Sequence, residues 1–178
     1  MGGNSLKKWV LLMTILLSWD AQAAKGVKYL GQEGAWKAFV SEQSKPRKCF
    51  LVSEPKEQTG NFSQRGKPHV MVAREASKKP QYVVSVVAGF TYKLQSEVEA
   101  RIQDNVFTFF TKEDTAWVDN STSDAKVVES LKAGKSMEVV GTSLRGNEIK
   151  DQYSLSGFSA ALKLIDKSCA VTEGKQNK

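Results

Sequence analysis

Apolar and polar residues alternate along much of the chain, the spacing that places every second side chain of a β-strand on the same face. In the first such segment, Trp36, Ala38 and Val40 lie on one face and Lys37 on the other. The pattern recurs and predicts further strands at 49–53, 68–74, 81–90, 97–102, 107–111, 115–118, 135–142 and 149–155. The segment 81–90 is apolar on both faces, so we expect it to lie centrally in a sheet that is covered on both sides.

The clearest hairpin signal has an Asp-Asn turn at residues 104–105, because both residue types tolerate a left-handed backbone. A turn centred there pairs Ile102 with Phe107 and Ala100 with Phe109. These four side chains then share one face, so the register and the apolar pattern agree.

Two stretches have helical spacing instead. A short helix is predicted from Ser123, which can cap it, to Gly134. A second helix follows a glycine corner at Gly157, and its buried stripe carries Phe158, Ala161, Leu162, Ile165 and Cys169.

The order of these elements contains no strand–helix–strand repeat. It predicts a mainly β fold, an antiparallel β-sandwich with two short helices, with a closed barrel as the alternative. The segment 55–67 has no apolar period and contains Gly60, Gly66 and several basic residues, so it is interpreted as a long exposed loop, either functional or simply solvated.

The first residues have the pattern of an export signal. Lys7 and Lys8 precede a short apolar run at 9–19, and Ala21-Gln22-Ala23 is a small-x-small cleavage site. No later stretch is long and apolar enough to span a bilayer. The predicted organisation is a secretory signal peptide at 1–23, a loose lead-in at 24–33, one β-sandwich domain at 34–170 and a polar tail at 171–178.

Export changes the interpretation of the two cysteines. Cys49 and Cys169 in an oxidising compartment are expected to form a disulfide, and no CxxC motif indicates a redox-active thiol. The bridge would close a loop of about 120 residues, which the chain-entropy account values at roughly 4–5 kcal/mol.

Short motifs along the chain, in this order and spacing, resemble one family of bacterial envelope proteins. They are Gly34-Ala35-Trp36, Cys49, residues 60–68 (GNFSQRGKP), 83–89, 114–117, 132–134, 141–146, 153–158 and Cys169. The chain is similar over these residues to the invasion-associated locus B family.

The resemblance implies an immunoglobulin-like β-sandwich, export to the periplasm or outer envelope, and a role in entry into host cells, notably erythrocytes. The resemblance assigns no catalytic residue to this chain, so we expect a non-enzymatic binding protein without a cofactor. The alternative is a periplasmic structural or chaperone-like protein that supports envelope integrity.

Candidate chemistry is sparse. His69 is the only histidine, so a catalytic triad or a metal site would have to be built around it, and we expect neither. The formal charge of +7 is a mild excess without a dense basic run, which argues against nucleic acid as a partner.

Basic turns and one loop aromatic are the candidate binding surface. If the turns gather at one end of the domain, they suit a host-cell surface protein, an anionic glycan, an anionic lipid or another envelope protein. The candidate residues are Lys45, Arg47, Lys48, Phe62, Arg65, Lys67, Lys78 and Lys79.

Overall fold

The computed structural model describes residues 26–79 and 81–171. The strands are β1 (Val27–Glu33), β2 (Trp36–Ser41), β3 (Lys48–Ser53), β4 (Glu57–Gly60), β5 (His69–Glu75), β6 (Tyr82–Val87), β7 (Glu97–Ile102), β8 (Asn105–Lys112), β9 (Thr115–Trp117), β10 (Ser136–Thr142) and β11 (Glu148–Ser154). The helices are α1 (Ser121–Ala133) and α2 (Phe158–Ser168). The predicted signal peptide at 1–23 and residues 172–178 of the predicted tail lie outside the described residues.

All eleven strands of the described residues belong to one antiparallel sheet, in the order β1-β2-β3-β5-β6-β9-β8-β7-β10-β11-β4. The sheet is open, with β1 at one edge and β4 at the other. The short strand β9 joins its two halves, because Trp117 pairs with Ser85 of β6 on one side and with Phe110 of β8 on the other.

The mainly β class, the antiparallel pairing and the two helices are therefore confirmed, whereas the immunoglobulin-like sandwich is not. A sandwich needs two separate sheets, and here β9 keeps the hydrogen bonding continuous. Alternation reports which way side chains face but not which strands share hydrogen bonds, so a strongly curved single sheet gives the same sequence pattern.

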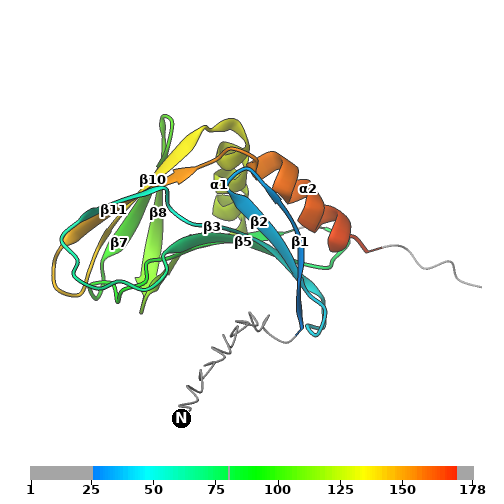
Figure 1. Cartoon of the computed structure of the whole chain (residues 1–178), viewed down its shortest axis with the longest axis horizontal. Coiled ribbons are helices and arrows are strands. Elements are labelled where there is room, and N and C mark those ends of the chain that lie inside the picture. The colour runs from blue at the N-terminus through cyan, green and yellow to red at the C-terminus, as the bar shows by residue number, and fades with distance from the viewer. Residues whose placement is uncertain (1–25, 80, 172–178) are drawn as a thin grey trace, which may run out of the picture.

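Both helices cover the same face of the sheet and lie beside each other (Figure 1). Helix α2 packs on β1, β2 and β3, and α1 packs on β6. The α2 stripe is buried as predicted, with Phe158, Ala161 and Ile165 at most 1% exposed. Asp124 of α1 accepts a hydrogen bond from the backbone N–H of Val84 at 2.7 Å, which fixes the helix to β6.

The corner before α2 connects the start of β2 to the end of β11. Trp36 is fully buried, donates from Nε1 to the carbonyl of Ser154 at 3.1 Å, and meets Phe158 edge-on at 4.9 Å between ring centroids. Gly157 has φ of 86°, and a side chain there would strike the backbone of Glu33. Glycine is therefore required for the chain to turn into α2.

The β7–β8 hairpin forms in a register two residues from the predicted one. Ala100 pairs with Phe107 and Val98 with Phe109, because the turn lies at residues 103–104, where Gln103 takes φ of 51°. A shift of two keeps the face of every side chain, so Phe109 is still fully buried.

Three other boundaries also differ. The lead-in was expected to be loose, but residues 27–33 form β1, and β4 lies inside the expected loop at 55–67. Both are edge strands with mostly exposed side chains, so they lack the apolar alternation by which strands are recognised. Helix α1 begins earlier than expected because Asn120, not Ser123, caps it by accepting from the N–H groups of residues 122 and 123.

Strand β6 is central, and the face that carries Val83 is covered at Ser85, which is 2% exposed, but open at Val83. Val84 and Val86 are 1% exposed, whereas Val83 is 50% exposed on the opposite face. The expectation that the sheet is covered on both sides at this strand is therefore wrong at Val83. Neither described helix is long and apolar enough to cross a membrane.

Candidate functional site

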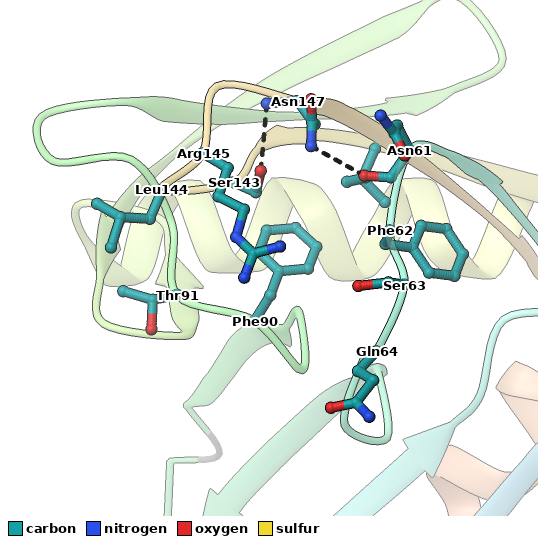
Figure 2. A pocket seen from close by; sticks show the side chains of 11 residues that line it. Asn61, Phe62, Ser63, Gln64, Phe90, Thr91, Ser143, Leu144, Arg145 and Asn147 are labelled. Carbon is teal, nitrogen blue, oxygen red and sulfur yellow. Dashed lines mark hydrogen bonds between the residues drawn. The ribbon is translucent and has the colours of Figure 1, made fainter.

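Three loops that are far apart in sequence enclose a cleft of about 470 Å³ (Figure 2). Residues 61–64 follow β4, residues 90–91 follow β6, and residues 143–147 form the turn between β10 and β11. Because neighbouring strands are antiparallel, the C-terminal ends of β4, β6 and β10 lie at the same end of the sheet.

A buried arginine connects the first two loops to the sheet. The guanidinium of Arg65 donates to both carboxylate oxygens of Asp151 on β11, at 2.6 and 2.5 Å, and through Nε to the carbonyl of Ala88 at 2.6 Å. The two side chains are only 4% and 5% exposed. Such a bidentate pair fixes orientation as well as distance.

The same guanidinium lies between two aromatic rings. It is 5.5 Å from the ring centroid of Phe62 and 5.0 Å from that of Phe90, within the range of cation–π attraction. Arg65 also donates to the side-chain oxygen of Gln58 on β4 at 3.0 Å. The two aromatic walls of the cleft are therefore held by one buried charge.

The backbone beside Arg65 is packed as closely as glycine allows. The N–H of Gly66 donates to the carbonyl of Gly89 at 2.8 Å, and Gly89 has φ of 71°. A side chain on Gly89 would come within 2.8 Å of the Gly66 backbone. The loops after β4 and β6 thus touch directly because both residues lack a side chain.

The turn between β10 and β11 is bonded to the other two loops. Asn147 donates from its side chain to the carbonyl of Asn61 at 3.0 Å, and the N–H of Leu144 donates to the carbonyl of Thr91 at 2.8 Å. The N–H of Asn147 also donates to the hydroxyl of Ser143 at 3.2 Å. All three loops are therefore ordered with respect to each other.

Two tyrosines lie next to the ion pair inside the fold. Burial, with the charge of Asp151 nearby, raises the pKa of the Tyr92 and Tyr153 phenols well above the ordinary value of 10. Both stay neutral over the physiological range, so neither adds a charge beside the Arg65–Asp151 pair.

The cleft offers hydrogen bonds, two rings and one positive charge. Its lining has no His, Cys, Asp, Glu or Lys, so it presents neither a general base nor a metal-binding set. Arg145 is exposed and has no ion pair among the described residues, and Figure 2 shows its side chain extending over the cleft. The other polar groups of the lining come from Asn61, Ser63, Gln64, Thr91, Ser143 and Asn147.

His69 does not belong to this lining. Its Nδ1 lies 3.0 Å from the carbonyl oxygen of Lys67 at the start of β5. Within residues 26–79 and 81–171, no group of three or more His, Cys, Asp or Glu side chains could hold a metal ion.

The predicted binding residues fall into two separate groups. Lys45, Arg47, Lys78 and Lys79 lie on the turns at 42–47 and 76–79, and Lys48 begins β3. All five lie beside the C-terminal end of β5, whereas Phe62, Arg65 and Lys67 lie beyond its N-terminal end. The seven residues of β5 span about 20 Å at roughly 3.3 Å per residue, so the two groups do not form one patch.

Within the second group, only Phe62 contributes to the cleft as a partly exposed anchor, at 38% exposure. Arg65, expected on the surface, is buried. The sequence interpretation missed Asn61, Gln64, Arg145 and Asn147, although the first three belong to the glycine-containing motifs at 60–68 and 141–146 and Asn147 directly follows the second.

The predicted disulfide is confirmed. Cys49 on β3 is bonded to Cys169 at the end of α2, with 6.1 Å between their Cα atoms. Beside it, Arg74 of β5 donates to Asp166 of α2 at 2.6 Å and to the carbonyl of Cys169 at 3.3 Å. Tyr82 donates to the same carboxylate oxygen of Asp166 at 2.7 Å.

Comparisons with known proteins agree with this architecture. A family model described as "Invasion associated locus B (IalB) protein" matches residues 36–166. The crystal structure of invasion associated protein b from Bartonella henselae is similar in fold, with a TM-score of 0.56 and 17% sequence identity over 78% of this chain and 95% of that one. No curated protein matches the chain.

Proposed function

Because the chain belongs to the invasion associated locus B family, we propose that it is an exported, non-enzymatic protein that acts in host-cell contact by binding a ligand in the three-loop cleft. The disulfide supports an oxidising compartment, where such bridges persist. The link to host entry is supported by the family's description and by the name of the Bartonella henselae protein.

The observation that carries the proposal is the ordering of the cleft before any ligand binds. Arg65 and Asp151 are both at most 5% exposed, and a buried ion pair is costly to build unless its geometry is well satisfied. Here Arg65 holds the rings of Phe62 and Phe90, and the hydrogen bond from Asn147 to Asn61 adds the third loop. A rigid, preformed site lowers the entropic cost of binding.

The lining selects for a polar, negatively charged ligand such as an acidic glycan. Side-chain amides and hydroxyls match the donors and acceptors of sugar hydroxyls, and Phe62 offers a ring for the apolar face of a sugar. Arg145 supplies a planar guanidinium suited to a carboxylate or sulfate.

The test measures binding of the purified protein to sialyllactose and to heparin oligosaccharides by titration calorimetry, with lactose as the uncharged comparison. Arg145→Ala is expected to weaken binding of the acidic sugars at least about tenfold, since a charge-assisted hydrogen bond contributes about 1.5–3 kcal/mol. Phe62→Ala is expected to weaken all three sugars.

The matched control is Lys163→Ala, which removes an exposed positive charge from α2, on a different part of the molecule. Adhesion of protein-coated beads to erythrocytes should follow the same order as the sugar affinities. Unchanged affinity and adhesion in Arg145→Ala and Phe62→Ala would contradict the cleft as the binding site. A gene deletion that causes detergent sensitivity and no adhesion defect would instead favour a role in envelope integrity.

A further inference from the structure

A row of apolar side chains crosses the sheet on the face opposite α2. In the register of the strands, Tyr29 lies opposite Phe39, Phe39 opposite Phe50, Phe50 opposite Ala73, and Ala73 opposite Val83. The ring centroids of Tyr29 and Phe39 are 5.6 Å apart and those of Phe39 and Phe50 are 5.4 Å apart. This face is distinct from the core, into which the alternate residues of the same strands point.

Part of the row forms the floor of a hollow of about 690 Å³. Phe50, Met71, Ala73 and Val83 line it, with Val27 of β1 at one side. Val83 is 50% exposed near the start of β6, a strand in the interior of the sheet order. An exposed apolar surface of this kind indicates a binding role.

The hollow opens toward the basic turns. The turns at 42–47 and 76–79 are adjacent, because the N–H of Ala76 donates to the carbonyl of Arg47 at 2.7 Å. Lys48 lies on the rim and pairs with Glu75 at 3.4 Å. The other cations on these turns, all exposed, are Lys45, Arg47, Lys78 and Lys79.

The carboxylates on these turns and at the end of β5 are Glu42 and Glu75, fewer than the five cations, and Asp166 at the same end is paired with Arg74. An apolar floor next to positively charged turns is complementary to a molecule that has a hydrocarbon chain next to a negative head. A glycan or a charged peptide would leave the apolar floor unused, and a purely apolar partner would leave the cations unused.

We propose that this hollow docks the protein on an anionic phospholipid bilayer, with one acyl chain on the Phe50–Val83 floor and the lipid phosphate at the basic turns. The site lies at the opposite end of β5 from the three-loop cleft and does not depend on it. Membrane attachment through this face would leave the cleft free to bind its own ligand.

The test is co-sedimentation of the purified protein with vesicles of phosphatidylglycerol mixed with phosphatidylcholine, compared with vesicles of phosphatidylcholine alone. We expect binding to the anionic vesicles only. Reversing two cations, in Lys45→Glu with Lys48→Glu, should weaken binding at least about fivefold, since each basic residue near an anionic surface contributes roughly that factor.

The apolar floor is tested by Val83→Glu, and by the milder Val83→Ser in case the acidic variant fails to fold. Both should weaken vesicle binding while the thermal unfolding temperature shows an intact fold. The matched controls are Phe110→Glu, an equally exposed apolar position on the same face but outside the hollow, and Lys163→Glu with Lys167→Glu on α2. Neither control should change binding.

Three results would overturn the proposal. One is equal binding to neutral and anionic vesicles, or no binding to either. Another is binding that depends on the lysines but not on Val83, which would mean simple electrostatic adsorption. The third is a dimer in sedimentation velocity that Val83→Glu dissociates, which would assign this face to a second copy of the chain.

Discussion

The two ends of β5 each bury an arginine that contacts an aspartate from a distant part of the chain. At the cleft end, Arg65 pairs with Asp151, and both side chains are at most 5% exposed. At the other end, Arg74 is 4% exposed but its partner Asp166 is 36% exposed. The first end has no covalent bond across it, whereas the second lies beside the disulfide.

This difference separates two ways of holding the ends of a curved sheet. Helix α2 is held mainly by the covalent bond and its apolar stripe, and Arg74 adds to both. The loops around the cleft have few buried apolar side chains, so their order depends on the Arg65–Asp151 pair. A site built from loops can therefore be rigid without a core of its own.

The largest effect is expected from removing the disulfide. The double variant Cys49→Ser with Cys169→Ser should lose about 4–5 kcal/mol of unfolding free energy, because the unfolded chain regains the freedom of a loop of 120 residues. Urea denaturation at 25 °C measures the loss, and reduced wild-type protein is the control that should match the variant. A loss below about 1 kcal/mol in both would mean that Arg74 and the apolar stripe hold α2 by themselves.

The next largest effect is expected at the cleft end. Arg65→Met should cost about 3–5 kcal/mol, because it leaves the carboxylate of Asp151 buried without a partner. Amide hydrogen exchange should increase at Gly66 and Leu144, whose N–H groups bond between the loops.

The matched control for Arg65→Met is the double variant Arg65→Met with Asp151→Leu. Removing both charges should recover part of the lost stability, while the loops stay disordered because the bond to Ala88 and the contacts with both rings are gone. If hydrogen exchange of the loops were unchanged in both variants, Arg65 would not be what orders the cleft.

The difference between the disulfide end and the cleft end also explains which features can be predicted from the sequence. The stripe from Phe158 to Cys169 and the disulfide follow from local spacing and from the export signal, and both were predicted. The faces of the β7–β8 hairpin followed from alternation, although its register did not, because a shift of two residues leaves the same side chains buried.

The cleft could not be predicted in the same way. Its residues come from three loops whose proximity depends on strand order, and alternation does not encode strand order. Arg65 in particular sits in a polar loop sequence that is typical of an exposed residue, and only the position of Asp151 on β11 makes it buried. The edge strands β1 and β4 were missed for a related reason, since they carry little apolar signal.

A smaller effect is expected at the disulfide end from Arg74→Met, about 1–3 kcal/mol. The cost is lower than at Arg65 because Asp166 is partly exposed and water can solvate its charge. In the variant without the disulfide, the cost of Arg74→Met should differ by more than about 0.5 kcal/mol from its cost in the wild type, since both features hold the same end of α2. Strict additivity would show that they act independently.

The smallest effect is a pH dependence at the same end. Burial and the hydrogen bond to Asp166 raise the pKa of Tyr82 to about 12 from its ordinary value of 10. The unfolded state therefore loses this proton first, so stability is fully present below pH 10 and declines as the pH rises from 10 to 12. Tyr82→Phe should reduce this decline in urea denaturation at high pH.

The decline should not vanish in Tyr82→Phe, because the pKa values of Tyr92 and Tyr153 are also raised by burial at the cleft end. The pH dependence that remains in Tyr82→Phe therefore comes from Tyr92 and Tyr153 at the cleft end. The part that the substitution removes comes from Tyr82 at the disulfide end. Unfolding of Tyr82→Phe at pH 7 separates the loss of the hydrogen bond to Asp166 from the loss of the titration. If the stability of wild type and variant declined equally between pH 10 and 12, the ionisation of the Tyr82 phenol would not be coupled to the folding of this end. Arg74 would then be the partner that stabilises Asp166.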